Sequence, residues 1–456
     1  MRPAAQDGWT DRSSATARER VAVVGSGVSG LTAAYLLQRR YDVLLFEADD
    51  RLGGHAHTHD VADRRAGSLA VDSGFIVHNA RTYPNLLRLF GELGVATQET
   101  EMSMSVRCLG CGLEYAGAKG ARGVFARPAN LHDLRFLRML AEIRRFHRHA
   151  RRLLAQPTDA PDLRAAVDAA DGGTLGRFLE QGGYSGYFAD HFLVPLVSAV
   201  WSTGPELVLR YPARYLFEFL DHHGMLSVTG SPRWRTVVGG SRSYVERAVK
   251  GLSAVNVSTP VRAVRRGPDG VTLWDEAGTR YEVDRVVLAT HPDQALRLLT
   301  DATRAEQDVL GAIGYSRNET VLHTDASVLP RSKSARSCWN YLVPHCGARL
   351  GPSTERAVVT YDMNQLQHLE AADDQYLVTL NAAEATGAEA IDESRVLARM
   401  LYEHPVYTPE SVDAQARLPE LRTERTVYAG AYHGWGFHED GCASGVAAAA
   451  TFGVRW

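Results

Sequence analysis

The sequence predicts an α/β protein in which a parallel sheet is interwoven with a second, α+β domain. A strand, a glycine-rich turn, a helix and another strand follow one another over residues 20–47, and such alternation is typical of a parallel sheet. A further buried strand, Asp284–Leu288, lies far along the chain and leads into a loop. The 456 residues correspond to about three domain-sized units, or to two large ones built from interleaved segments.

The composition excludes several classes of protein. Hydrophobic residues make up 45% and charged residues 23% of the chain, which does not fit a disordered, collagen-like or membrane-embedded protein. The formal net charge is -3, so we expect no nucleic-acid partner. Five cysteines without regular spacing form no disulfide framework, and residues 1–20 lack the apolar core of a signal peptide. We therefore expect a cytoplasmic protein.

The first strand, turn and helix predict a dinucleotide site. Val21–Val24 runs into Gly25-Ser26-Gly27-Val28-Ser29-Gly30, and Leu31–Arg40 then has helical spacing. In this pattern Gly25 permits the tight turn, Gly27 lets the backbone approach a pyrophosphate, and Gly30 allows close helix packing. The second strand, Asp42–Phe46, delivers Glu47 at about the 20-residue interval expected of an acid that binds the ribose.

Two segments after Glu47 resemble motifs of flavin enzymes. Arg51-Leu52-Gly53-Gly54-His55 resembles the R-x-G-G-R/H segment of the flavin amine oxidase and phytoene desaturase superfamily, in which the paired glycines run along the FAD pyrophosphate. Val71-Asp72-Ser73-Gly74-Phe75-Ile76 resembles the V-D-x-G strand that lies close to the flavin ring. The resemblance implies that FAD is the cofactor and that these residues contribute to its site: Arg51, Gly53, Gly54, His55, Gly74 and Phe75.

Later segments extend the resemblance. A glycine pair at 239–240 opens a helix, and the residue corresponding to Val261 meets the adenine through its backbone in the superfamily. The segment 430–445 reads as a loop that enters a helix pointing at the flavin ring. There Glu439 or Asp440 could bond the ribityl chain or cap the helix, and we place Ala443 beside them in the cofactor site.

From Val21 onward the chain resembles a bacterial family of predicted NAD/FAD-binding oxidoreductases, through phrases such as Gly74–Asn79 and Gly436–Gly441. Members of that family are often encoded beside cyclopropane-fatty-acid-synthase-like methyltransferases, and some desaturate methylated fatty acyl chains. The resemblance implies a Rossmann-like FAD-binding domain of the glutathione-reductase type. It also implies an FAD-dependent oxidoreductase that dehydrogenates a hydrophobic acyl-chain substrate by hydride transfer to flavin N5. A double-bond isomerase, an amine oxidase and a non-catalytic flavoprotein remain alternatives.

The motifs divide the chain into a flexible tail at 1–19 and two interwoven domains. The FAD-binding domain comprises 20–88, 232–299 and 410–456, and the substrate domain comprises 89–231 and 300–409. Within the substrate domain, residues 191–197 and 215–220 are apolar enough to line a long-chain pocket, although core packing explains them equally well.

Three side chains are candidates for an acid or base at the flavin: His78, His323 and Tyr361. His78 follows the V-D-x-G strand. The related amine oxidases usually have a lysine near flavin N5, whereas the candidate strand here, 319–323, carries His323 instead. This departure weighs against amine oxidation.

Two patterns could hold a metal ion, and we predict that neither does. His55, His57 and His59 alternate along a segment that already has a flavin-contact interpretation. Cys108-Leu109-Gly110-Cys111 could be a redox motif or half of a zinc site, but zinc would need a second ligand pair, and Cys338 and Cys346 lack the usual zinc spacing. We therefore expect a hairpin turn with two incidental thiols.

Residues 134–153 predict an amphipathic helix with a basic face. Its apolar positions recur in three- or four-residue steps: Leu134, Leu137, Leu140, Ile143, Phe146, Ala150 and Leu153. Arginines between these positions form the basic face. A solvated surface is the ordinary interpretation of that face, and peripheral contact with anionic lipid or an acyl carrier is the alternative. The expected ligand is a hydrophobic small molecule or acyl lipid. The sequence indicates neither the oligomeric state nor the electron acceptor.

Overall fold

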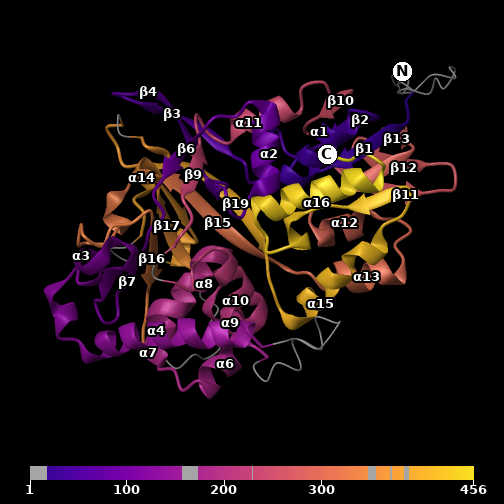
Figure 1. The fold of residues 1–456 in the computed structure, drawn as a ribbon. Coiled ribbons are helices and arrows are strands. Elements are labelled where there is room, and N and C mark those ends of the chain that lie inside the picture. The colour runs from indigo at the N-terminus through magenta and orange to yellow at the C-terminus, as the bar shows by residue number, and fades with distance from the viewer. Residues whose placement is uncertain (1–17, 157–172, 228–229, 348–355, 370–371, 385–389) are drawn as a thin grey trace.

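The computed structural model describes residues 18–156, 173–227, 230–347, 356–369, 372–384 and 390–456. A five-stranded parallel sheet and a seven-stranded mixed sheet organise most of them (Figure 1). The tail predicted over 1–19 lies outside the described residues except at its end.

The parallel sheet is assembled from distant parts of the chain. Its strands, in spatial order, are β10 (Ala254–Asn256), β2 (Asp42–Phe46), β1 (Arg20–Val24), β14 (Arg285–Leu288) and β20 (Thr426–Tyr428). Every neighbouring pair is parallel. Residues 21–23 in the central strand are completely buried, because layers cover both faces of the sheet.

Successive side chains of β1 enter two different cores. Val21 and Val23 pack with one helical layer: α1 (Val28–Leu37), α2 (Pro84–Leu93), α11 (Arg242–Ala248) and α16 (His438–Thr451). Ala22 and Val24 pack with the other layer. That layer contains an antiparallel sheet, β11 (Val261–Arg266), β12 (Val271–Asp275) and β13 (Arg280–Val283), with α12 (Pro292–Leu298), α13 (Arg304–Leu310) and α15 (Pro409–Arg417).

Helices α1 and α16 lie side by side over the parallel sheet (Figure 1). Glycines on α16 permit the close approach. A Cβ atom on Gly445 would lie 2.4 Å from the carbonyl oxygen of Ser29, and one on Gly441 would lie 2.6 Å from a methyl group of Val28. The backbones are therefore nearly in contact where the two helices begin.

The seven-stranded sheet organises the second part of the fold. Its strands, in spatial order, are β19 (Val396–Pro405), β15 (Tyr315–His323), β18 (Leu377–Leu380), β17 (Val358–Asp362), β16 (Trp339–Val343), β7 (Met104–Cys108) and β8 (Glu114–Ala116). Only β16 and β7 pair in parallel among these strands. A helical layer shares its core: α4 (Leu134–Leu154), α6 (Leu175–Gln181), α7 (Gly186–Phe188), α8 (Val194–Trp201), α9 (Pro205–Arg210) and α10 (Ala213–His222).

Smaller elements complete the fold. They are the hairpin of β3 (Thr58–Asp63) and β4 (Gly67–Asp72), the sheet of β5 (Val77–Asn79), β9 (Trp234–Val237) and β6 (Thr97–Thr100), and helices α3 (Gly120–Val124) and α14 (Met363–Gln367). The short segments are η1 (Gly117–Lys119), η2 (Pro128–Leu131), η3 (Ala189–Leu193, π-helical), η4 (Ala326–Val328), η5 (Ala382–Glu384), η7 (Glu393–Arg395), η8 (Leu418–Leu421) and η9 (Ala431–His433).

The predicted α/β class is confirmed. The strands of the parallel sheet come from 20–88, 232–299 and 410–456, and those of the seven-stranded sheet come from 89–231 and 300–409. The domain boundaries themselves stay a prediction. None of the helices in the described part combines the length and apolar character that crossing a bilayer requires.

The predicted apolar face of residues 134–153 is wrong at its start. Leu134 is 79% exposed and Leu137 is 37% exposed, whereas Phe136 and Met139 are completely buried. Both pairs have helical spacing, and the larger side chains of the second pair fill the core against α10. Phe146 and Ala150 are buried as predicted.

Candidate active site

A cavity of about 740 Å³ runs between the parallel sheet and the seven-stranded sheet. One end is formed by the loops after β1, β2 and β14, where ligands bind in open α/β sheets. The other end is formed by aromatic and aliphatic side chains of α8, α10 and the seven-stranded sheet. The volume is within the range of small-molecule and cofactor sites, roughly 300–1,000 Å³.

The glycine turn after β1 has the conformation that the sequence predicts. Gly25 has a φ of 99°, and a Cβ atom there would lie 2.7 Å from the carbonyl oxygen of Ala289. A Cβ atom on Gly30 would collide with the carbonyl oxygen of Gly25. Gly27 differs, because no heavy atom lies within 4 Å of an added Cβ and the residue lines the cavity. Gly27 therefore leaves its space open to a ligand.

Glu47 lies at the end of β2 and lines the same end of the cavity. Its carboxylate accepts hydrogen bonds from the backbone N–H of Ser26 (2.9 Å) and of Asp49 (3.1 Å), and from the Ser26 hydroxyl. Val261, predicted to meet the adenine, lines the cavity close by with Thr259 and Pro260. Glu47 is thus fixed in the position expected of the ribose-binding acid.

Residues of the segment after Glu47 have two roles: some line the cavity, and one shapes the turn. Arg51, Gly54 and His55 line the cavity, and Nη1 of Arg51 is buried without a hydrogen-bond partner. Gly53 does not line the cavity, and its place beside the pyrophosphate stays a prediction. Its φ of 112° and the 2.5 Å between an added Cβ and the carbonyl oxygen of Ala56 show that it shapes the turn.

The V-D-x-G strand brings an aromatic stack to the cavity wall. Gly74 and Phe75 both line it, and a Cβ atom on Gly74 would lie 2.2 Å from the carbonyl oxygen of His55. The Phe75 ring stacks on His438 with centroids 3.8 Å apart. Burial lowers the pKa of His438 to about 3 and that of His404, also in the wall, to about 4. These rings are therefore neutral at pH 7.

The loop before α16 contributes its backbone and its rings rather than its carboxylates. Glu439 accepts hydrogen bonds from the backbone N–H groups of Asn85 and Leu86, both at 3.0 Å, at the start of α2. Asp440 accepts one at 2.9 Å from the N–H of Phe437 and so caps its own helix. Neither carboxylate lines the cavity, nor does Ala443. Asp440 takes the helix-capping role, one of the two that the sequence allows, and the place of the three residues in the cofactor site stays a prediction.

Two helix N-termini open on the cavity instead. Gly27 and Val28 line it at the start of α1, and Phe437 and His438 line it at the start of α16. Each terminus presents backbone N–H groups and the positive end of a helix dipole. This end of the cavity is therefore suited to an anionic group.

The three predicted acid–base candidates have different positions. Tyr361 on β17 lines the cavity, with its ring perpendicular to that of Trp339 at 5.2 Å between centroids. Burial raises the pKa of Tyr361, so the hydroxyl keeps its proton at neutral pH. Tyr361 can therefore donate a hydrogen bond into the cavity.

His323 and His78 do not line the cavity, and their catalytic role stays a prediction. His323 is completely buried; Nε2 lies 2.8 Å from the Thr379 hydroxyl, and Nδ1 accepts from the N–H of Asp325. His78 packs behind Phe75 against Phe90, where burial lowers its pKa to about 4. Both rings are held inside the protein.

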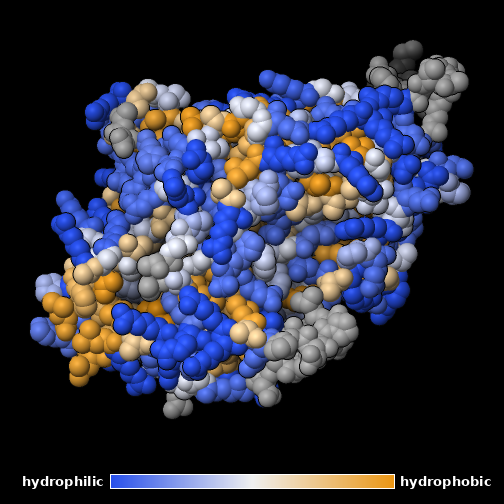
Figure 2. Space-filling model, in the orientation of Figure 1, coloured by the Kyte–Doolittle hydropathy of each residue, from blue (hydrophilic) through white to orange (hydrophobic). Residues whose placement is uncertain are grey.

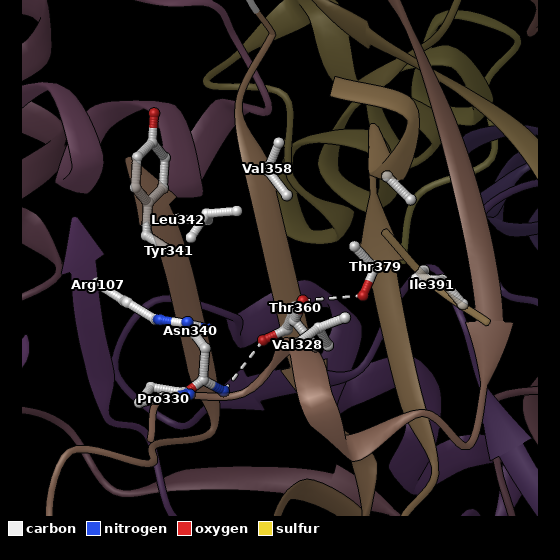
Figure 3. A pocket seen from close by; sticks show the side chains of 11 residues that line it. Arg107, Val328, Pro330, Asn340, Tyr341, Leu342, Val358, Thr360, Thr379 and Ile391 are labelled. Carbon is white, nitrogen blue, oxygen red and sulfur yellow. Dashed lines mark hydrogen bonds between the residues drawn. The ribbon is translucent and has the colours of Figure 1, made fainter. Parts of the chain in front are cut away.

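A second, much smaller pocket lies against the seven-stranded sheet beside Thr379 (Figure 3). Its space is about 10 Å³, close to the minimum for one water molecule. Figure 3 shows the Thr360 and Thr379 hydroxyls bonded to each other, at 2.8 Å, and the Asn340 amide donating to the carbonyl oxygen of Thr360. This pocket is too small for a substrate.

The sequence did not indicate several other residues of the large cavity. Tyr402 and His404 of β19 line it, and Tyr402 stacks on His55 at 4.9 Å. Trp201, Met225 and Leu380 line the aromatic end. No local motif marks them, because long-range packing brings them to the cavity. From the two apolar segments that could line a pocket, only Phe219 does so.

Comparisons with known proteins agree with this geometry. The model of the family described as flavin containing amine oxidoreductase matches residues 28–451. A flavin-containing monoamine oxidase named AofH, from Mycobacterium tuberculosis, is 29% identical over 280 residues, which are 60% of this chain and 57% of that protein. The chain thus spans little more than half the length of this relative.

Two solved structures have the same fold. Cyclohexylamine oxidase from Brevibacterium oxydans superposes with a TM-score of 0.66, at 18% identity, over 95% of this chain and 98% of that one. A fatty acid isomerase from P. acnes that produces CLA superposes with a TM-score of 0.65, at 16% identity, over the same shares. At such identities the likeness concerns the fold alone.

FAD is the cofactor, and the cavity fits it. The open space at Gly27, the unpartnered nitrogen of Arg51 and the two helix N-termini suit a pyrophosphate, and Glu47 suits a ribose. Among the residues that the structure describes, no lysine lines the cavity.

Replacing Gly27 with Val should remove most of the bound FAD while the fold is kept. The φ of -62° at this position suits Val, and the new side chain would occupy the space of the pyrophosphate. We expect flavin content below about a tenth of wild type, measured by absorbance of the purified protein, with an unchanged circular dichroism spectrum. Gly91→Val is the control, because that glycine of α2 is exposed and its added Cβ is equally open. Full flavin content in Gly27→Val would contradict the assignment.

Asp440→Asn should change how stability depends on pH. Burial raises the pKa of Asp440 to about 7, against about 3.9 for an exposed aspartate. Between these values the folded protein binds a proton that the unfolded chain releases, so this group lowers the free energy of unfolding as pH rises. Asparagine keeps an acceptor for Phe437 but does not titrate. The variant should therefore gain Tm relative to wild type between about pH 4 and 7, and a constant difference would refute this.

Proposed function

Because the chain belongs to the family of flavin containing amine oxidoreductases, and is an FAD-dependent oxidoreductase, we propose that it dehydrogenates a neutral, hydrophobic acyl chain. The single observation that supports this substrate class most is the composition of the aromatic end of the cavity. Large apolar side chains form its walls: Val200, Trp201, Phe219, Met225, Trp339 and Leu380. An elongated apolar substrate would bury its surface there.

The charges of the cavity support a neutral substrate. Its carboxylates are those of Glu47, Asp49 and Glu403 in the described part of the chain. Glu47 belongs to the nucleotide end, and Glu403 pairs with His291 at 3.2 Å and Arg317 at 3.6 Å. Among the residues that the structure describes, no carboxylate is therefore available at the aromatic end to pair with an ammonium group, and an unpaired buried cation would be costly.

FAD, when bound, accepts two electrons as a hydride from a C–H bond. The protein must place that bond and keep water away. Trp201 donates from its indole nitrogen to the carbonyl oxygen of Trp435 at 2.9 Å, which fixes the loop before α16 against the aromatic wall. Tyr361, whose hydroxyl keeps its proton, would orient a polar group of the substrate.

Anaerobic spectroscopy would test the substrate class. FAD-loaded protein is titrated first with unsaturated or methyl-branched fatty acyl lipids and then with amines, while the flavin band near about 450 nm is followed. We expect acyl lipids alone to bleach the band and to lose two hydrogens per turnover. Bleaching by amines alone, or a product of unchanged mass as an isomerase would give, would contradict the proposal. Tyr361→Phe should keep FAD and bleach roughly 100-fold more slowly.

We also propose that the start of α4 touches an anionic membrane surface on the cytoplasmic side. Figure 2 shows apolar residues gathered at the lower left, over the segment that leads into α4. Leu131, Leu134 and Leu137 are 52%, 79% and 37% exposed, and the side chains of Arg135 and Arg138 are 66% and 65% exposed. Exposed leucines beside arginines are typical of interfacial helices.

Vesicle co-sedimentation would test this contact. The protein should bind vesicles containing phosphatidylglycerol more strongly than pure phosphatidylcholine vesicles, because the arginines attract anionic headgroups. Leu134→Glu should weaken binding about tenfold, whereas Leu397→Glu, at a leucine of β19 that is 46% exposed, should not. Equal binding to both lipid compositions would contradict the proposal.

A further inference from the structure

Three cysteines and a histidine meet outside the cavity, around the turn between β7 and β8. Their ligand atoms all lie within 4.8 Å of one another, and they belong to Cys108, Cys111, His191 and Cys346. None of the four lines the large cavity. Within the part of the chain that the structure describes, this is the one group of three or more metal-ligating side chains at such separations.

The separations suit a tetrahedral metal site. Sγ of Cys111 lies 3.4 Å from Nε2 of His191. Bonds of about 2.3 Å from zinc to sulfur and about 2.0 Å to nitrogen place two such ligands about 3.5 Å apart in a tetrahedron. The two atoms are therefore already at the spacing that a shared ion requires.

The histidine is held in the orientation of a metal ligand. Nδ1 of His191 donates to the carbonyl oxygen of Tyr187 at 3.0 Å, which leaves the lone pair of Nε2 facing the cysteines. The ring is buried and stacks on Tyr187 with centroids 4.0 Å apart. Tyr115 also donates to the carbonyl oxygen of His191 at 2.8 Å. Segment η3, which carries the ring, is a π-helical turn, a form that is frequent at functional sites.

The turn between the cysteines has the shape that brings the sulfurs together. A Cβ atom on Gly110 would lie 2.9 Å from Sγ of Cys346 and 3.1 Å from its backbone nitrogen, so only glycine fits there. Gly112 has a φ of 73°, which again favours glycine. The N–H of Leu109 donates to the carbonyl oxygen of Val343 at 2.9 Å and ties the turn to the end of β16.

We propose that these four side chains bind one structural zinc ion: Cys108, Cys111, His191 and Cys346. Three thiolates and one imidazole in a closed tetrahedron form a typical structural zinc set. The ion would link 89–231 to 300–409, since Cys346 belongs to the second segment and the other ligands to the first. All five cysteines are free, so the thiols are available to a metal.

The expectation of no metal site is thereby revised. The predicted hairpin turn at 108–111 is present between β7 and β8. The missing second ligand pair, however, is His191 with Cys346, and Cys338 lies outside the cluster. His191 and Cys346 are so far apart in the sequence that no ligand-spacing motif could have indicated them.

Elemental analysis of the FAD-loaded protein is the first test. Protein from zinc-supplemented cells should carry about one zinc ion per chain. Cys346→Ser should lose at least about nine-tenths of that zinc while keeping its flavin, because one thiolate of four ligands is removed. His345→Ala is the matched control, since His345 is the exposed neighbour of Cys346 and lies outside the cluster. Full zinc in Cys346→Ser, or none in wild type, would overturn the proposal.

Wild-type protein alone provides a second test if Cys346→Ser does not fold. Exchange of zinc for cobalt(II) should give the intense red-region bands of a tetrahedral thiolate site, at wavelengths where oxidised flavin does not absorb. After denaturation with a chelator all five cysteines should react with a thiol reagent. An octahedral cobalt spectrum, or a disulfide that joins Cys346 to Cys108 or Cys111, would overturn the proposal.

Discussion

The near contact of α1 and α16 is the constraint on which the cofactor end of the cavity depends. Side chains in place of Gly441 and Gly445 would meet atoms of Val28 and Ser29 at less than 3 Å. Because these two glycines have no side chains, α1 and α16 can begin close to each other. The positive ends of both helix dipoles therefore face the same cavity. A larger residue at either glycine would separate the helices and move Phe437 away from the wall.

The buried carboxylate of Asp72 connects the cofactor end of the cavity to other parts of the molecule. Asp72, at the end of β4, accepts hydrogen bonds from Thr58 (2.6 Å), from the N–H of Ser241 (3.0 Å) and from the amide of Gln367 (3.1 Å). Thr58 belongs to the β3–β4 hairpin, Ser241 precedes α11, and Gln367 ends α14 beside the seven-stranded sheet. Several donors on one carboxylate offset the cost of burying it. The two ends of the cavity are consequently held in a fixed relation.

How far the sequence could predict the structure depends on the range of the interactions. The turn at Gly25, Gly27 and Gly30 follows from the backbone conformation of six consecutive residues, and the sequence indicates it correctly. Glu439 caps α2, which begins more than 300 residues earlier in the chain, and no local pattern could show which of its possible roles it takes. His323 has a plausible position in the sequence, yet Thr379 and Asp325 satisfy both of its nitrogens inside the sheet. Long-range partners, rather than residue type, decide these cases.

The interleaving of segments determines when the protein can be completed during synthesis. Helix α1 forms from residues 28–37, but the face that it shows to α16 stays uncovered until residues 438–451 have left the ribosome. The same holds for β20, which pairs with β14 only after residue 426 is available. A nascent chain therefore exposes this apolar surface until residue 438 and those after it have been made, and a cavity able to retain FAD first exists when residues 438–451 are available.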